Sequence, residues 1–220
     1  MDLRCLKQMI DLTHEIREST PAYPGDPKVS RERVYTVDRD GFAVDAWRIG
    51  THLGTHVDAA AHVFEGNNGV KLSEYPLSRF EGVARVAEIK EGESEITIEA
   101  VRKVCPSDRQ VDWIIVRSGW EKYWDRPETY FAGRYPILTS SAVEFLANVK
   151  IKGIALDMPS PDPYGQDAYI HRKLLAHGLL IVENLANVEL LPMDEDLWLS
   201  VWPLKLASGD AAPVRAIARF

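Results

Sequence analysis

Four titratable side chains lie within eleven residues of each other in the stretch THLGTHVDAAAHVF, residues 51–64. They are His52, His56, Asp58 and His62, and they include three of the six histidines in the chain. Imidazole and carboxylate groups are the usual ligands of Zn²⁺ and Mn²⁺. The cluster therefore predicts a site for a divalent cation, provided that the backbone can bring these side chains together.

The spacing of the cluster limits the backbone shapes that could form such a site. Ligand atoms on one ion lie about 3–4 Å apart, because each is about 2.0–2.2 Å from the metal. A straight strand would separate His52 and His56 by about 13 Å, and a helix would turn Asp58 away from both. Gly54 offers another solution, since glycine adopts backbone angles closed to other residues. We expect a bend at Gly54, with His62 just outside the ion's shell; the alternative is a polar loop whose histidines bond to backbone groups.

Ligands from a single loop leave a cation incompletely coordinated, and His171 and Glu183 are the best distant candidates. His171 begins an expected helix at residues 171–176, and Glu183 directly follows the apolar run LLIV at residues 179–182. A helix start and a strand end can share one edge of an α/β unit, where sites are often built. A glutamate after four apolar residues indicates pairing or cation binding; otherwise it is the first exposed residue after the strand.

The remaining chemistry-bearing residues indicate no second site. The chain has no G-x-S-x-G elbow, G-x-G-x-x-G motif or P-loop, which argues against a serine hydrolase and against nucleotide binding. His14, in a polar N-terminal segment, and His177, at a helix end before Gly178, are interpreted as structural.

The elements that must position the cluster mix strands and helices. Apolar and β-branched runs predict strands at residues 9–12, 42–49, 83–89, 111–116, 151–156, 179–182 and 197–206. Helical spacing and capping residues predict helices at residues 96–104, 139–149 and 171–176. The strand at 42–49 alternates apolar and polar residues, which is typical of a half-buried strand. No repeat or linker interrupts the pattern, so we expect one α/β or α+β domain spanning residues 1–220.

Composition narrows the classes of partner. The chain has 220 residues, of which 45% are hydrophobic, and its net charge is −7 from 26 basic and 33 acidic residues. This balance argues against nucleic acid or an anionic membrane as partner. No apolar run reaches the length of a membrane span or a signal peptide, and Cys5 and Cys105 form no disulfide framework. We therefore expect a cytoplasmic protein.

The cluster also carries a resemblance to a known family. The stretch His52-Leu53-Gly54-Thr55-His56-Val57-Asp58, followed by His62, resembles the H-x-G-T-H-x-D-x-x-x-H signature of the cyclase-like metal-dependent hydrolases. That family includes bacterial kynurenine formamidases and isatin hydrolases. Shorter blocks are also similar to the family, at residues 10–14, 24–27, 117–120, 153–160, 171–185 and 212–215. Ala60 and Ala61 stand where many relatives have proline, which bears on loop rigidity and substrate preference.

The resemblance implies a fold and an assembly. The fold is a layered β/β/α arrangement of the swivelling-domain type, and such proteins form dimers or tetramers. It also implies one or two divalent ions, Zn²⁺ or Mn²⁺, with Asp58 bridging them and His62 as the acid/base residue. The implied metal ligands are His52, His56, Asp58, His171 and Glu183.

The activity implied is hydrolysis of an amide by metal-bound hydroxide. A divalent ion lowers the pKa of bound water towards about 7. We expect an arylformamidase that converts N-formylkynurenine and water into kynurenine and formate. The alternatives are a cyclic-amide hydrolase of the isatin hydrolase type and a non-catalytic metal- or ligand-binding protein. Trp47, Phe64 and Tyr23 are candidates for an aromatic substrate pocket or for ordinary packing.

Overall fold

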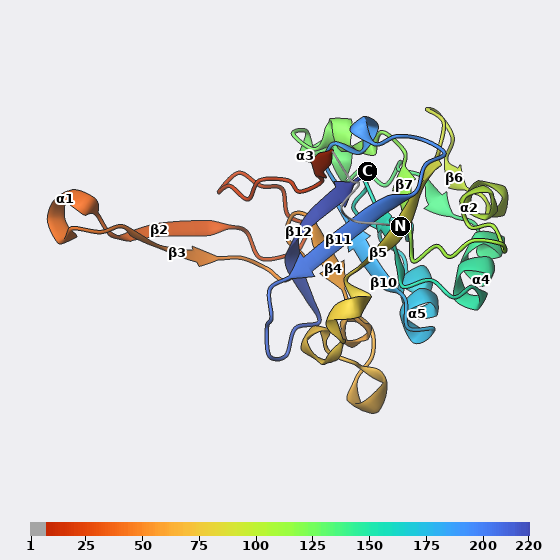
Figure 1. The fold of residues 1–220 in the computed structure, drawn as a ribbon. Coiled ribbons are helices and arrows are strands. Elements are labelled where there is room, and N and C mark those ends of the chain that lie inside the picture. The colour runs from red at the N-terminus through yellow and green to blue at the C-terminus, as the bar shows by residue number, and fades with distance from the viewer. Residues whose placement is uncertain (1–7) are drawn as a thin grey trace.

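An eight-stranded sheet that closes on itself forms the centre of the protein (Figure 1). The computed structural model describes residues 8–220, so Cys5 lies outside the described residues. The strand order is β1-β12-β11-β5-β7-β9-β10-β4, and β4 also pairs with β12, which closes the sheet. The strands are β1 (Met9–Asp11), β4 (His56–Asp58), β5 (Glu81–Glu88), β7 (Trp113–Arg117), β9 (Gly153–Leu156), β10 (Leu180–Glu183), β11 (Leu197–Pro203) and β12 (Ala211–Arg219).

Four neighbouring strands of this sheet, β5, β7, β9 and β10, run parallel, and the other pairings are antiparallel. Parallel strands are covered on both faces, which explains why their sequences are continuously apolar. In β7, Trp113 and Ile115 belong to the core cluster inside the closed sheet. Ile114 and Val116 alternate with them and belong to the cluster beneath the helices. The sheet therefore separates two hydrophobic cores.

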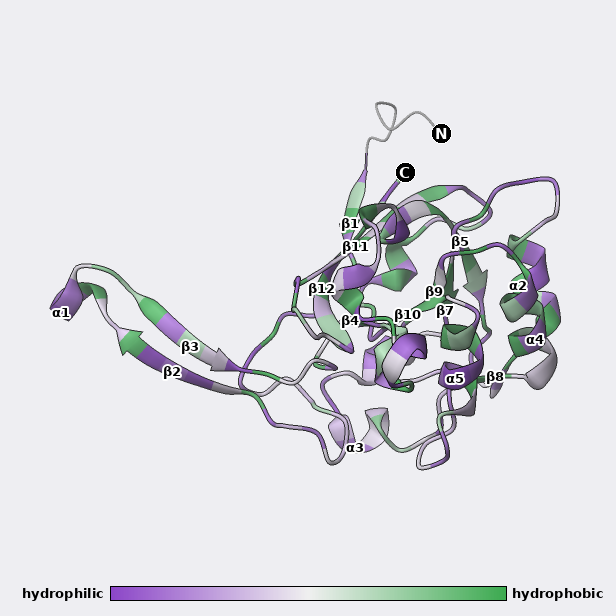
Figure 2. Ribbon diagram, turned by 90° about the horizontal axis from the view of Figure 1, so that it is seen from below, coloured by the Kyte–Doolittle hydropathy of each residue, from purple (hydrophilic) through white to green (hydrophobic). Residues whose placement is uncertain are grey.

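Three helices cover the outer face of the parallel strands (Figure 2). They are α2 (Ile98–Val104), α4 (Ser140–Asn148) and α5 (Tyr169–Ala176). Threonine hydroxyls cap the first two: Thr97 accepts a hydrogen bond from the amide of Ala100, and Thr139 accepts one from that of Ala142. The short helix α3 (Pro127–Tyr130) and the two-stranded sheet of β6 (Glu95–Ile96) and β8 (Ile137–Leu138) complete the body. No helix within residues 8–220 has the length and apolar character needed to cross a bilayer.

A long two-stranded projection, here called the arm, extends from this body (Figure 1). It comprises residues 30–48 and contains β2 (Ser30–Tyr35), α1 (Val37–Asp40) and β3 (Val44–Arg48). The strand predicted at residues 42–49 is confirmed as β3, but its predicted half-burial is wrong, because no residue of the arm is buried in this chain. The alternating pattern is present, but the part of the chain that the structure describes places nothing over its apolar side.

Candidate metal centre and active site

The site is assembled on β4 and the bend that precedes it. Gly54 has a φ of +62°, the left-handed conformation that the spacing of the cluster predicted. His56 and Asp58 are alternate residues of β4, so both side chains leave the same face of the strand. β4 pairs with β10 in a register that sets His56 opposite Glu183. The strand pairing itself therefore brings a distant carboxylate to the cluster.

The side chains of the other four predicted ligands converge around Asp58. One carboxylate oxygen of Asp58, Oδ1, lies 2.9 Å from His52 Nδ1 and 3.4 Å from His56 Nε2. Its other oxygen, Oδ2, lies 3.4 Å from His171 Nε2. Glu183 approaches two of the same histidines: its Oε2 lies 3.4 Å from His56 Nε2, and its Oε1 lies 3.2 Å from His171 Nε2. These separations match the distances of about 3–4 Å between ligands of one ion.

The donor atoms fall into two groups that share Asp58. The first group is His52, His56 and Asp58, and the second is Asp58, His171 and Glu183. Within each group the ligand atoms lie within 4.8 Å of one another. A carboxylate shared between two ligand sets suits a site for two ions.

Several buried polar atoms of this cluster lack hydrogen-bond partners among the described residues. They are His56 Nε2, both oxygens of Asp58 and Glu183 Oε1. Leaving such atoms unpartnered in a protein interior is costly. Burial alone would raise the pKa of Asp58, but the adjacent His56 and His52 hold it well below its usual value. The donor set therefore suits a divalent cation, which would satisfy all of these atoms at once.

Two further carboxylates orient the histidines from outside the cluster. Asp162 Oδ2 lies 2.6 Å from His171 Nδ1, and Asp162 also accepts hydrogen bonds from the backbone amides of Ile170 and His171 in the first turn of α5. Asp210 Oδ2 lies 3.1 Å from His52 Nε2. A carboxylate that accepts the proton of one ring nitrogen leaves the other nitrogen free to bind metal. His171 would thus bind through Nε2, and His52 through Nδ1.

The third histidine is oriented by a backbone carbonyl at the bend. The carbonyl oxygen of Gly54 lies 2.9 Å from His56 Nδ1 and also accepts a hydrogen bond of 2.9 Å from Asn184 Nδ2. Asn184 has a φ of +58°, and its Oδ1 accepts a hydrogen bond of 2.8 Å from the hydroxyl of the buried Tyr130. Asparagine tolerates this left-handed conformation better than most residues. Asn184 thereby links the bend to the end of β10.

His62 lies beside the cluster, outside both ligand groups. It ends a short 3-10 turn at Ala60–His62 and is exposed, and its ring centroid lies 4.1 Å from that of His52 and 5.4 Å from that of His171. Desolvation of the ring, assisted by the two neighbouring histidines, lowers the pKa of His62 to about 4. A neutral ring at pH 7 can accept a proton. His62 also forms a third possible metal group with His52 and Asp210.

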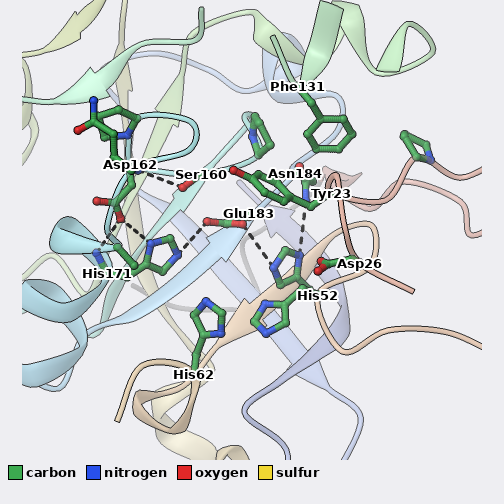
Figure 3. A pocket seen from close by; sticks show the side chains of 16 residues that line it. Tyr23, Asp26, His52, His62, Phe131, Ser160, Asp162, His171, Glu183 and Asn184 are labelled. Atoms are coloured by element: carbon green, nitrogen blue, oxygen red, sulfur yellow. Dashed lines mark hydrogen bonds and ion pairs between the residues drawn. The ribbon is translucent and has the colours of Figure 1, made fainter. Parts of the chain in front are cut away.

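A cavity of about 310 Å³ opens above these side chains (Figure 3). This is at the lower end of the volumes of about 300–1,000 Å³ typical of small-molecule sites. Tyr23 and Phe131 meet edge to face at 5.6 Å and line the cavity across from His62. Tyr23 is therefore at the site. Trp47 is not, because it lies on the arm, and Phe64 packs against the core beneath the helices.

Three residues that orient the predicted ligands were not themselves predicted: Asp162, Asn184 and Asp210. Asp162 lies between two prolines, two residues beyond the block at 153–160 that resembles the family. Asn184 directly follows Glu183, and its position at the end of a buried strand is the sequence feature that could have indicated its role. Asp210 follows Ser208 and Gly209 and carries no local signal, because it reaches His52 only through the pairing of β12 with β4.

The two histidines interpreted as structural lie outside this cavity. His14 stacks on Trp124 with ring centroids 4.0 Å apart. His177 is exposed after the end of α5, and its Nδ1 lies 2.8 Å from the carbonyl oxygen of Lys173.

Comparisons with known proteins find similar sequences over most of the chain. A family model described as a putative cyclase matches residues 10–163. The chain is 28% identical over 214 residues to a kynurenine formamidase of Salinibacter ruber (strain DSM 13855 / M31), covering 96% of this chain and 97% of that protein.

Solved structures share the fold. An isatin hydrolase A from Labrenzia aggregata, bound to benzyl benzoate, has a TM-score of 0.83 at 24% identity and covers 96% of this chain and 93% of its own. A predicted metal-dependent hydrolase from Bacillus stearothermophilus has a TM-score of 0.77 at 22% identity and covers 96% of this chain and 98% of its own. The α/β fold expected from the sequence is confirmed.

Proposed function

Since the chain belongs to the cyclase family, we propose that it is a metal-dependent amide hydrolase whose lead substrate is an N-formyl aromatic amine such as N-formylkynurenine. The observation that carries the proposal is the pair of ligand groups sharing Asp58 at the base of a cavity of small-molecule size. Similarity to a kynurenine formamidase over nearly the whole chain supports the choice of substrate.

The metal ligands would be the five side chains that converge in the structure. Zn²⁺ and Mn²⁺ both suit three imidazoles and two carboxylates. Two ions are favoured over one because the two oxygens of Asp58 face different groups. The proposed ligands are His52, His56, Asp58, His171 and Glu183.

The reaction joins a water oxygen to the amide carbon and breaks the C–N bond. When bound, the cation supplies Lewis acidity: it lowers the pKa of a coordinated water and polarises the amide carbonyl. A ring nitrogen of His62 accepts the proton that the water loses and passes it to the departing nitrogen. Tyr23 and Phe131 hold the aromatic ring of the substrate and exclude water from one side of the cavity. The products are formate and the free amine.

The variant His62→Ala tests the roles in this scheme. We expect kcat to fall by about 10²–10⁴-fold, the usual contribution of a general acid or base, while metal content measured by elemental analysis stays near that of the wild type. His177→Ala is the matched control, since His177 is exposed and remote from the cavity, and it should change neither quantity. Loss of metal from His62→Ala would instead make His62 a ligand together with His52 and Asp210.

One observation favours a second candidate, the ring opening of a neutral cyclic amide such as isatin. Among residues 8–220, no lysine or arginine lines the cavity, so these residues offer no fixed cation to the carboxylate of an amino-acid substrate. Asp26, at the rim of the cavity, instead favours N-formylkynurenine, because its carboxylate can pair with the ammonium group of that substrate.

The two candidates are separated by steady-state hydrolysis of N-formylkynurenine and of isatin. The protein is first treated with a chelator, and Zn²⁺ or Mn²⁺ is then restored. We expect the higher kcat/KM on N-formylkynurenine, and we expect Asp26→Asn to raise KM for that substrate but not for isatin. Higher kcat/KM on isatin would select the second candidate. A metal-loaded protein that turns over neither aryl formamides nor cyclic amides would contradict the proposed activity and favour a binding protein.

A further inference from the structure

A third group of possible metal ligands lies beside the two groups that share Asp58, and it is more exposed than they are. It consists of His52, His62 and Asp210, whose ligand atoms lie within 4.8 Å of one another. Figure 3 shows the rings of His52 and His62 side by side, and both residues line the cavity. The proposed hydrolysis needs no ion at this group, so its donor atoms have a capacity that the mechanism does not use.

His52 presents its two ring nitrogens to two different carboxylates. Nδ1 lies 2.9 Å from Asp58 Oδ1, inside the first ligand group, and Nε2 lies 3.1 Å from Asp210 Oδ2. A neutral imidazole carries one N–H group and one lone pair. When Nδ1 binds a metal ion, the proton is on Nε2 and is donated to Asp210. A single proton therefore joins Nε2 to Asp210, at a place where a divalent cation can replace it.

His62 completes the set of donors. Its ring centroid lies 4.1 Å from that of His52, and its side chain is exposed, so the ring can adjust to an ion at little cost. Two imidazoles and one carboxylate, with a fourth position open to water, are a ligand set that Zn²⁺ accepts. Mn²⁺ binds such sites more weakly and prefers oxygen ligands. The group therefore favours Zn²⁺ over Mn²⁺.

This group should bind an ion more weakly than the two groups that share Asp58. All of its negative charge comes from Asp210, whose side chain is 40% exposed, whereas Asp58 and Glu183 are buried. Solvent and salt screen attraction at an exposed site, and ions in the neighbouring groups repel a further cation. The proton on His52 Nε2 must also be displaced. We therefore expect the group to fill only after the other two.

We propose that His52, His62 and Asp210 form a third, weaker Zn²⁺ site, and that an ion bound there stops hydrolysis when free zinc is high. On binding, a bond forms between the ion and His52 Nε2, the N–H bond at that nitrogen breaks, and the proton passes to solvent. Asp210 exchanges its hydrogen bond to His52 for a bond to the ion. No change of oxidation state is involved, since zinc has no redox chemistry.

An ion at this site would remove His62 from the reaction. The lone pair with which His62 accepts a proton from water would be bound to zinc, so the ring could no longer act as a base. The ion would also occupy space in the cavity, because His52 and His62 both line it. This inhibition rests on the proposed hydrolase function, whereas the binding of the ion does not.

The first measurement is the number of Zn²⁺ ions bound per chain, by equilibrium dialysis against zinc buffers and elemental analysis. We expect the wild type to bind one more ion at high free zinc than at the low free zinc that fills the first two groups. Asp210→Asn keeps the size of the side chain but removes its charge, and His62→Ala removes a ligand. In both variants the dissociation constant of the additional ion should rise at least about 10-fold, no less than for loss of a residue that merely orients a ligand.

His177→Ala is the matched control for adventitious zinc binding by an exposed histidine, and it should keep the additional ion. Asp210 also orients His52, so Asp210→Asn can weaken the ion of the first group. In that case His62→Ala provides the test by itself, because His62 lies outside the first two groups.

The second measurement is the rate of hydrolysis of N-formylkynurenine as free zinc is raised. We expect excess Zn²⁺ to lower kcat of the wild type, and the same excess of Mn²⁺ to lower it far less. For Asp210→Asn, half-inhibition relative to its own maximal rate should require at least about 10-fold more zinc. Equal inhibition by the two metals would overturn the assignment of the site to zinc.

The two measurements separate the proposed site from the proposed function. A wild type that gains no ion at high zinc, or variants that gain it as readily as the wild type, would overturn the site. An additional ion that leaves kcat unchanged would overturn the inhibition. A protein that hydrolyses no amide at any zinc concentration would contradict the proposed function, while the count of bound ions would still decide whether the third site exists.

Discussion

Only seven residues separate the end of the arm at Arg48 from β4, which begins at His56 and carries part of the metal-ligand cluster, yet the arm and the cluster use charge in opposite ways. On the arm, Asp45 pairs with two arginines in contact with solvent. In the cluster, Asp58 is fully buried and neither oxygen has a hydrogen-bond partner among the described residues. Water can replace the ion pairs of the arm, whereas the buried oxygens of Asp58 are closed to water. The same residue type should therefore differ greatly in importance between the two regions.

The largest effect should follow from Asp58→Asn. This change keeps the shape of the side chain but removes the negative charge that both ligand groups share. We expect bound metal to fall close to zero and activity to fall further than in His62→Ala. Elemental analysis of the purified protein and steady-state kinetics measure the two effects.

Asp157→Asn is the control for that variant, since Asp157 is equally buried. Its carboxylate accepts hydrogen bonds from Ser118, Gly119 and Trp120 and takes no part in the ligand groups. We expect Asp157→Asn to lower the melting temperature but to retain metal. Full metal occupancy in Asp58→Asn would remove the basis for the contrast between the two regions.

An intermediate effect should follow from Asp162→Asn. The asparagine can still accept hydrogen bonds at the start of α5, but it cannot hold the His171 proton as a carboxylate does. We expect metal affinity to weaken by about 10–100-fold, as for other carboxylates that orient a metal-binding histidine. Competition with a chelator measures the affinity, and the exposed Asp167→Asn serves as control. Unchanged affinity would mean that the ring of His171 is fixed by packing alone.

The smallest effect should follow from Asp45→Asn on the arm. Exposed ion pairs contribute little to stability, because water and salt screen them. We expect no resolvable change in the melting temperature or in metal content, measured by calorimetry and elemental analysis. A large loss of stability would show that this ion pair contributes more than an exposed pair, which would weaken the contrast between the two regions.

Local chemistry made half of the site predictable. His52, Gly54, His56 and Asp58 lie within seven residues, so the requirement that ligands converge already demanded the bend that Gly54 provides. His171 and Glu183 could be proposed from their places at a helix start and a strand end, and the family resemblance supported them. Asp210 could not, because its contact with His52 depends on the long-range pairing of β4 with β12.

Prediction of the fold had the same limit, because pairings between distant segments could not be predicted from local sequence. The parallel strands were predicted because burial on both faces makes them continuously apolar. β12 (Ala211–Arg219) was missed, since its alanines and its proline are poor strand formers and only its place in the sheet makes it extended. β2 was missed because its charged residues face no core. Closure of the sheet could not be predicted, because no local pattern specifies which edges meet.

The strand that closes the sheet, β4, carries two of the proposed metal ligands. Asp58 on β4 pairs with Ile181 of β10 on one side and with Ala211 of β12 on the other. Joining these remote segments during folding carries a loss of chain entropy that local contacts do not offset. An ion held by Asp58 on β4 and Glu183 on β10 would fasten these two strands together, so its free concentration should affect the stability of the whole fold.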